Sequence, residues 1–364
     1  MKTCLILSAA AVLCLAGCKQ PAPNEAGKAP GAAASANVAT ANPLDGMRFA
    51  DAPAPNTPFT APANMAIAVA LDRLGFSSGV IDGKATRFDE AALRGFQAAH
   101  DLPTTGKLDD ATKQALGAAA QMPATRLVKV PDAFAAGPFI PDLPKETSKQ
   151  AGFDHLSYRN LTEALAERFH TTPEILAALN GGPNATVKAG ATIRVPNVAD
   201  VDTAKLGEDA RDWNKTLVTL GVAPDQPQAD KVEVSKSQGL LRAYDASGKL
   251  LAQFPVTTGS SHDPLPIGNW KIQGVSKNPD YHFNPKLFWD VSDSKKDALL
   301  NPGPNGPVGV VWLDLSKEHY GIHGTGEPAS IGQSASHGCV RLTNWDAARL
   351  AQMVKAGTAV EFKK

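Results

Sequence analysis

From Lys231 onward, apolar and polar residues alternate along the chain, and this period of two constrains the fold more than any other sequence feature. Val232 and Val234 open the pattern, which continues through "LLRAY" and "KLLAQFPV" with turn sequences between them. Three later segments, "GNWKIQGV", "GVVWLDLS" and "YGIHG", also have the composition of strands. We therefore expect a mainly β domain over residues 228–364.

One helix interrupts this β pattern. The segment "TNWDAARLAQMVKAG" offers Thr343 as an N-cap and Asp346 three residues later, and its apolar residues line one helix face up to Gly357. The strand "AVEF" follows. The expected domain thus combines many strands with a single helix.

The chain before this domain is helical. Residues 63–120 contain three short segments, "MAIAVALDRLG", "FDEAALRGFQAAH" and "LDDATKQALG", each with apolar residues on one face. They predict a small three-helix bundle, and the same apolar positions would serve equally in a spacer bundle that has no ligand.

Residues 153–197 predict a second small unit, an α+β module with two helices and a strand. Its second helix begins after Thr171 or Thr172, followed by Pro173. The Pro-rich residues 121–152 and the residues 198–227 are expected to be linkers. Several domains agree with the length of 364 residues, and 43% hydrophobic residues suffice for sizeable cores.

The net charge excludes one class of partner. The chain carries 36 Lys and Arg residues and 36 Asp and Glu residues, and no basic block stands out. Because no net field attracts a polyanion, we expect no nucleic acid partner.

The first residues, "MKTCLILSAAAVLCLAGC", combine one basic residue with a short apolar run and small residues, which is typical of an export signal. "LAGC" resembles the lipobox of bacterial lipoproteins, which implies a signal peptide over residues 1–17 and a lipid on Cys18. Lys19 favours anchoring in the outer membrane, facing the periplasm of a Gram-negative bacterium. Residues 18–62, rich in Ala, Pro and Asn, predict a disordered tether.

Cys339 in "SASHGCVRL" is the only cysteine after Cys18. A cysteine nucleophile needs a nearby base or positive field, and the spacing leaves both His337 and His323 open as that base. Gly338 allows a substrate carbonyl to approach, so the backbone N–H groups of Gly338 and Cys339 could stabilise an oxyanion. This set of groups indicates acyl transfer, while a Cys-His-His zinc site and a purely structural cysteine are alternatives.

The segment "GIHGTGEPASIGQSASHGCVRLTNWDAARLA" resembles the catalytic segment of YkuD-type L,D-transpeptidases, also called the ErfK/YbiS group. "VTTGSSHDPLPIGNW" and "NPGPNGPVGVVWLDLS" are similar to the flanking parts of that family. The resemblance covers residues 228–364 and implies a YkuD-like β-sandwich with one helix. It implies no cofactor and no metal.

Residue by residue, the resemblance implies that Cys339 is the nucleophile and His323 the general base, oriented by the carbonyl of Gly324. His337 and Gly338 then support the oxyanion.

Three further residues are expected to bind substrate: Arg341, Ser336 and Tyr320. A guanidinium pairs bidentately with carboxylates, so Arg341 suits a substrate carboxylate. An ion pair with a residue such as Asp346 is an equal alternative for Arg341.

The upstream units have resemblances of their own. "LDRLGFSSGVIDGKATRFDEAALRGFQAAHDLPTTGKLDDATKQAL" resembles the peptidoglycan-binding-like domain. Residues 153–197 resemble a LysM glycan-binding module, although the usual Gly-Asp-Thr entry is replaced by "SYRNLTEA".

Together these resemblances imply a peptidoglycan substrate. Cys339 would attack the diaminopimelate carbonyl of a tetrapeptide stem, release D-alanine and pass the acyl group to an amine. A second diaminopimelate as acceptor gives a 3→3 cross-link, and a lysine of an envelope lipoprotein gives an anchored protein. The alternatives are a hydrolase, with water as acceptor, and a non-enzymatic wall-binding lipoprotein anchored to the membrane.

Overall fold

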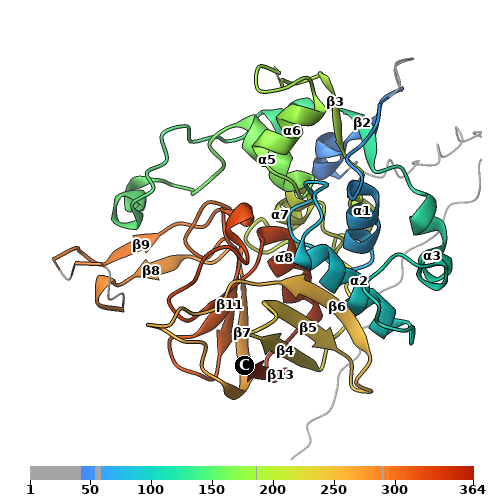
Figure 1. The fold of residues 1–364 in the computed structure, drawn as a ribbon. Coiled ribbons are helices and arrows are strands. Elements are labelled where there is room, and N and C mark those ends of the chain that lie inside the picture. The colour runs from blue at the N-terminus through green and yellow to red at the C-terminus, as the bar shows by residue number, and fades with distance from the viewer. Residues whose placement is uncertain (1–41, 54–58, 186, 288–290, 293) are drawn as a thin grey trace, which may run out of the picture. The chain divides into compact units, whose positions relative to one another are not determined.

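The computed structural model describes residues 42–53, 59–185, 187–287, 291–292 and 294–364 (Figure 1). The expected signal peptide, Cys18 and the first part of the expected tether lie outside the described residues. Within the described part, no helix has the length and apolar character that crossing a membrane requires.

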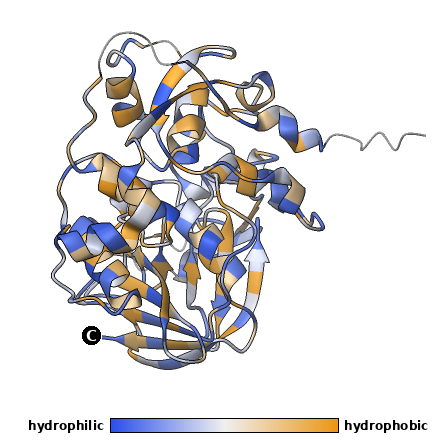
Figure 2. Ribbon diagram, turned by 90° about the vertical axis from the view of Figure 1, so that its right-hand side faces the viewer, coloured by the Kyte–Doolittle hydropathy of each residue, from blue (hydrophilic) through white to orange (hydrophobic). Residues whose placement is uncertain are grey.

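Eight strands of the C-terminal domain form one sheet in the order β12-β11-β10-β7-β13-β4-β5-β6. Their bounds are β4 Lys231–Ser235, β5 Leu240–Tyr244, β6 Leu250–Pro255, β7 Gly268–Lys277, β10 Val311–Leu315, β11 Gly321–His323, β12 Val340–Arg341 and β13 Ala359–Lys363. Hydrophobic and hydrophilic bands alternate along the strands (Figure 2). The alternation predicted from Lys231 is confirmed in β4, where Val232 and Val234 are fully buried.

Strand β7 connects the two halves of the expected sandwich into one hydrogen-bonded sheet. Its first residues, 268–271, pair antiparallel with β13, and residues 272–277 pair antiparallel with β10. β13 in turn pairs parallel with β4. Buried residues from both halves belong to one hydrophobic core.

Helix α8, Asn344–Met353, lies against β10 and β11 and contributes Trp345 and Leu350 to that core (Figure 1). The predicted N-cap is confirmed, because the Thr343 side chain accepts a hydrogen bond from the Asp346 backbone N–H. The helix ends before the predicted Gly357, since Val354 already has extended backbone. Among the described residues of 228–364, α8 is the only α-helix.

A second, two-stranded sheet of β8, Tyr281–Phe283, and β9, Ala298–Leu300, packs on the upstream chain. Leu300 forms a buried cluster with Leu143 and Leu156, and Lys295 forms an ion pair with Glu146. Short 3₁₀ helices flank these contacts at Thr147–Gly152 and Pro285–Leu287. Residues of the expected linker 121–152 therefore hold part of the C-terminal domain.

The three upstream helices are α1 Met65–Arg73, α2 Arg87–Ala99 and α3 Asp110–Leu116, followed by a 3₁₀ helix at Gly117–Gln121. A capping box of Thr86 and Asp89 begins α2. Their apolar cluster also contains Leu250 of β6, and Phe76 forms a parallel bridge with Gln253 of the same strand. These helices thus cover the edge strand of the large sheet, where an exposed edge would invite unwanted pairing.

Residues 153–197 contain α5, Leu161–Arg168, α6, Pro173–Leu179, and β3, Thr192–Pro196. Thr172 is the N-cap of α6, which decides between the two threonines expected there.

The expected linkers and tether differ from prediction, because they supply regular elements. β3 pairs with β2, Thr125–Lys129, and β2 pairs with β1, Ala50–Asp51. Beside them lie short helices at Pro43–Met47, Asp132–Ala135 (α4) and Thr203–Lys205, and α7 spans Trp213–Leu220. The physical reason is burial: these segments contain apolar side chains that join a shared core, namely Met47, Phe49, Val128, Val130, Phe134 and Val218.

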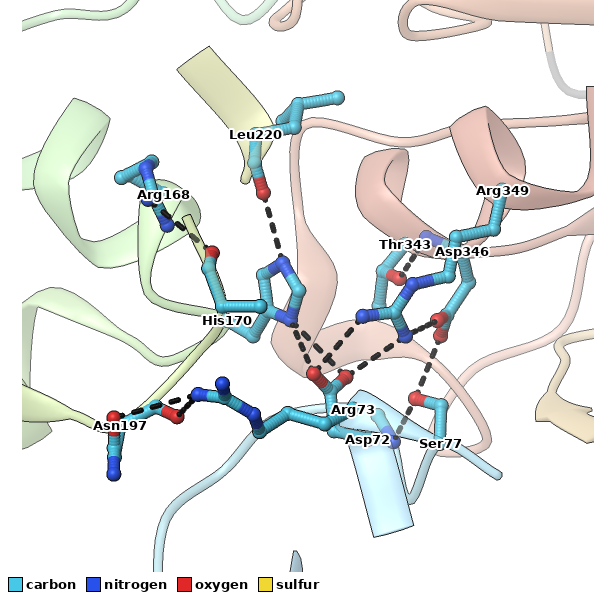
Figure 3. Close-up of polar contacts among 12 residues, drawn as sticks. Asp72, Arg73, Ser77, Arg168, His170, Asn197, Leu220, Thr343, Asp346 and Arg349 are labelled. Carbon is cyan, nitrogen blue, oxygen red and sulfur yellow. Dashed lines mark hydrogen bonds and ion pairs between the residues drawn. The ribbon is translucent and has the colours of Figure 1, made fainter. Parts of the chain in front are cut away.

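A buried ionic cluster joins three parts of the chain (Figure 3). The Asp72 carboxylate of α1 accepts hydrogen bonds from Nη1 and Nη2 of Arg349 on α8, each at 2.9 Å, and contacts Nδ1 of His170 at 3.1 Å. Asp346 accepts a hydrogen bond from Ser77 at 2.9 Å and lies 3.4 Å from Arg349.

These contacts set the charge of Asp72. Burial acts to raise the pKa of Asp72, but the charge of Arg349 and the hydrogen bonds from His170 and Arg349 outweigh it and hold that pKa well below its usual range. The carboxylate is therefore ionised and paired inside the protein.

The cluster predicts a stability effect. Asp72→Asn keeps the shape of the side chain but removes the carboxylate that both Nη atoms of Arg349 contact at 2.9 Å, so that only Asp346, at 3.4 Å, remains beside the buried guanidinium. Loss of one partner of a buried ion pair costs on the order of 3 kcal/mol, so the urea midpoint of unfolding should fall clearly. Lys113→Ala, which removes an exposed ion pair with Asp110, is the matched control and should leave the midpoint unchanged. Equal midpoints for Asp72→Asn and wild type would contradict the importance of the cluster.

Candidate active site

Parallel pairing of β11 with β12 sets the strand that ends at His323 beside the strand that follows Cys339. Ile322 is the register partner of Val340, and His323 is the register partner of Arg341. Side chains alternate along a strand, so Ile322 and Val340 enter the core while His323 and Arg341 lie on the opposite face. Cys339 precedes Arg341 by two residues and lies in the bend just before β12.

His323 is buried, with 4% of its surface exposed, and its Nδ1 lies 2.7 Å from the carbonyl oxygen of Gly324. A carbonyl only accepts hydrogen bonds, so Nδ1 carries the proton and Nε2 presents a lone pair. The Trp312 ring stacks on the imidazole at 5.6 Å between ring centres. Burial and the nearby charge of Arg341 lower the pKa of His323 to about 3, so the imidazole is neutral at pH 7.

Cys339 is a free, partly buried cysteine. Desolvation raises the pKa of its thiol, and this effect outweighs the backbone hydrogen bond from Gly321 and the charge of Arg341, which act in the other direction. The resting site therefore combines a neutral thiol with a neutral imidazole.

The turn that carries Cys339 depends on a glycine. Gly338 has φ +102°, a conformation that other residues rarely adopt, and a Cβ at this position would lie 2.7 Å from the Tyr320 ring. Ser336 stabilises the same turn, because its hydroxyl donates a hydrogen bond to the carbonyl of Cys339. His337 is partly buried in this turn.

The three expected substrate-binding residues, Tyr320, Ser336 and Arg341, lie near Cys339 and differ in the contacts that they make. Tyr320 packs against Gly338, and burial, with the Cys339 thiolate as a second cause, raises the pKa of its hydroxyl. The Ser336 hydroxyl is used within the turn, so it serves the backbone of the site. Among the described residues, the buried Nε of Arg341 has no hydrogen-bond partner.

The alternative ion pair between Arg341 and Asp346 is not formed. Asp346 instead contacts Ser77 and Arg349 in the buried cluster (Figure 3). Arg341 instead pairs through its backbone with Thr257.

Two aromatic residues at the site were not predicted. Tyr281 of β8 interacts with the charges of Cys339 and Arg341, and burial raises the pKa of its hydroxyl to about 12. Trp312 of β10 is the register partner of His323 as well as its stacking partner. The strand pattern of "GVVWLDLS" could have indicated Trp312, whereas Tyr281 lies in a region without a clear periodic signal.

The described residues contain no group of three or more His, Cys, Asp or Glu side chains that could hold a metal ion. The zinc interpretation of His323, His337 and Cys339 therefore has no geometric support in this part of the chain.

Residues 229–362 match the family model described as "L,D-transpeptidase catalytic domain" of the YkuD family, and residues 65–116 match the model "Putative peptidoglycan binding domain". The chain is 32% identical over 201 residues to the "Putative L,D-transpeptidase YkuD" of Bacillus licheniformis, which covers 55% of this chain and 92% of that relative.

The protein of the same name in Bacillus subtilis is 54% identical over 118 residues, covering 32% of this chain and 57% of that relative. A solved L,D-transpeptidase 3 from Mycobacterium tuberculosis aligns with 37% of this chain and 60% of its own, at 16% identity and a TM-score of 0.31.

The chain therefore belongs to the YkuD family of L,D-transpeptidases. It is a cysteine-dependent transpeptidase with a peptidoglycan-binding domain before the catalytic domain.

The electrostatics of the site predict how the thiol reacts with pH. Because burial raises the pKa of Cys339, the rate of its alkylation by iodoacetamide should keep rising beyond the ordinary thiol pKa of about 8.5. The measurement is the alkylated fraction of the Cys339 peptide by mass spectrometry, with glutathione as the reference thiol. A rate that is already maximal at pH 6 would indicate a preformed thiolate–imidazolium pair and contradict this prediction.

Proposed function

We propose that Cys339, with His323 as its general base, attacks the tetrapeptide stem of peptidoglycan and becomes acylated by it. The acyl group is then transferred from Cys339 to an amine. The observation that supports this proposal is the β11–β12 register, in which His323 is paired with Arg341, two residues after Cys339. Cys339 and His323 are also the two residues that the family resemblance identifies as nucleophile and base.

The proton moves during the attack. His323 Nε2 takes the thiol proton of Cys339 as the sulfur bonds to the diaminopimelate carbonyl carbon, because neither group is charged beforehand. The imidazolium then gives this proton to the nitrogen of the departing D-alanine, and the carbonyl carbon remains bound to sulfur as a thioester. The Gly324 carbonyl stabilises the imidazolium through Nδ1–H.

The turn before β12 supplies the oxyanion site. Its geometry supports roles for the backbone N–H groups of Gly338 and Cys339 and a supporting role for His337. Arg341, with an unpartnered Nε, suits a carboxylate of the stem, and Tyr320 lines the approach to the sulfur. Ser336 acts by holding the turn.

Transfer repeats the chemistry in reverse. An acceptor amine gives a proton to Nε2 of His323 and attacks the thioester, and the Cys339 sulfur leaves and recovers its proton. Diaminopimelate of another stem as acceptor yields a 3→3 cross-link, and a lysine of an envelope lipoprotein yields an anchored protein.

The upstream chain suits wall binding. Residues 153–197 keep the helix, helix, strand order of a LysM module, and β2, which pairs antiparallel with β3, supplies an opening strand from outside that range. We assign a LysM-like role to β2, α5, α6 and β3 together, beside the peptidoglycan-binding domain.

The proposed location is the periplasm, with a lipid on Cys18 anchoring the protein in the outer membrane. It rests on "LAGC" and Lys19. Such an anchor would place the catalytic domain at the cell wall.

The two histidines can be separated by mutation. His323→Ala should slow acylation of Cys339 by a carbapenem on the order of 100-fold or more, because the general base is lost, and His337→Ala should have a smaller effect. Intact-protein mass spectrometry at successive times gives both rates. If only His337→Ala prevents acylation, the assignment of the base to His323 is wrong.

The reaction itself can be read from cell walls. Incubating isolated sacculi with wild type should produce new 3→3 muropeptide dimers, whereas Cys339→Ala should produce none, as determined by mass spectrometry of digested walls. Trimmed monomers without new dimers would identify a hydrolase and overturn the transfer proposal.

A further inference from the structure

The first residue of α8, Asn344, is completely buried beside the catalytic strands and is held by three hydrogen bonds. Its Oδ1 accepts from the backbone N–H of Val310 at 3.2 Å, and its Nδ2 donates to the carbonyl of Pro304 at 3.0 Å and to Oε1 of Glu167 at 2.9 Å. Exchanging the amide oxygen and nitrogen would lose all three bonds, so the carboxamide has one orientation.

This fixed carboxamide lies directly against Gly324. A Cβ at Gly324 would be 2.2 Å from Oδ1 of Asn344, so only a glycine allows this contact. The carbonyl oxygen of the same Gly324 accepts a hydrogen bond from Nδ1–H of His323, with 2.7 Å between nitrogen and oxygen. Asn344 therefore contacts the residue whose carbonyl sets the tautomer and orientation of the imidazole.

The third partner of Asn344 comes from outside the catalytic domain. Glu167 lies on α5, 177 residues before Asn344, and is 5% exposed. It also has a side-chain hydrogen bond with Tyr158. Burial raises the pKa of Glu167 to about 7, although the bonds from Tyr158 and Asn344 favour its ionised form. The carboxyl group thus connects the LysM-like segment to the start of α8.

We propose that Asn344 is a positioning residue for His323 and that Glu167 holds Asn344 in place from the LysM-like segment. A segment that resembles a wall-binding module then takes part in orienting the general base. This inference rests on the proposed role of His323 and adds to it two residues that the catalytic motif does not explain.

The direct test is Asn344→Asp, which has nearly the same shape but replaces the two N–H donors by an oxygen facing Glu167 and Pro304. With the full chain, we expect carbapenem acylation at pH 7 to slow on the order of 10- to 100-fold, because a small displacement of a catalytic group is costly. Alkylation of Cys339 by iodoacetamide at pH 10 should stay at the wild-type rate, since a thiolate formed by hydroxide needs no base. General loss of structure would change both rates.

Two Glu167 variants test whether Glu167 holds Asn344 in place. Glu167→Gln keeps an oxygen that accepts from Asn344 and should acylate at close to the wild-type rate, whereas Glu167→Ala should be slowed in the same direction as Asn344→Asp. Gln352→Ala is the matched control on α8, because the Gln352 side chain donates to the backbone carbonyls of Ala223 and Ala348, away from the site, and this variant should acylate normally.

The outcomes distinguish this inference from the proposed function. If His323→Ala is slow while Asn344→Asp and Glu167→Ala acylate at the wild-type rate, the positioning role is wrong and the base assignment stands. If His323→Ala is as fast as wild type, the base assignment itself fails. Should Asn344→Asp not fold by circular dichroism, equal rates for Glu167→Gln and Glu167→Ala overturn the proposal, and a slower Glu167→Ala supports it.

Discussion

The ion pair between Asp72 and Arg349 is the interaction on which the arrangement of the described chain depends. It joins two helices whose paired residues are 277 positions apart, and both side chains are buried. His170 completes it from a third segment and stacks its ring on Trp345 at 4.8 Å between ring centres. Because an unpaired buried charge opposes folding, the cluster links the packing of the upstream helices to that of α8.

The catalytic geometry follows from the position of α8. The helix begins three residues after the end of β12, so contacts that hold its first turn also hold the short strand that carries Arg341 and follows Cys339. Burial raises the pKa of Cys339 and lowers the pKa of His323, because it disfavours the charged form of each group, the thiolate and the imidazolium. The resting thiol is consequently a weaker target for oxidants than a thiolate would be.

Local patterns allowed much of the fold to be predicted. Alternation in β4 and the Thr343 cap of α8 were predictable, because they depend on neighbours in sequence. The β1 and β2 strands and α7 were missed, since short apolar runs in Pro-rich surroundings show no clear period. The ionic cluster was not predicted, because nothing in the sequence distinguishes the buried Asp72 from other charged residues nearby in the chain. Tyr281 reaches the site only through the packing of β8 on the upstream segment.

The place of β13 in the large sheet has a consequence for how this domain folds. Residues 359–363 lie between β7 and β4, so they form an inner strand although they follow every other strand in the chain. Because the chain is synthesised from its amino end, the sheet is incomplete until these residues have been made. Until then the β4–β6 meander lacks the hydrogen-bonding partner of β4. The sheet that carries β11 and β12 is therefore completed only after residues 359–363 have been synthesised.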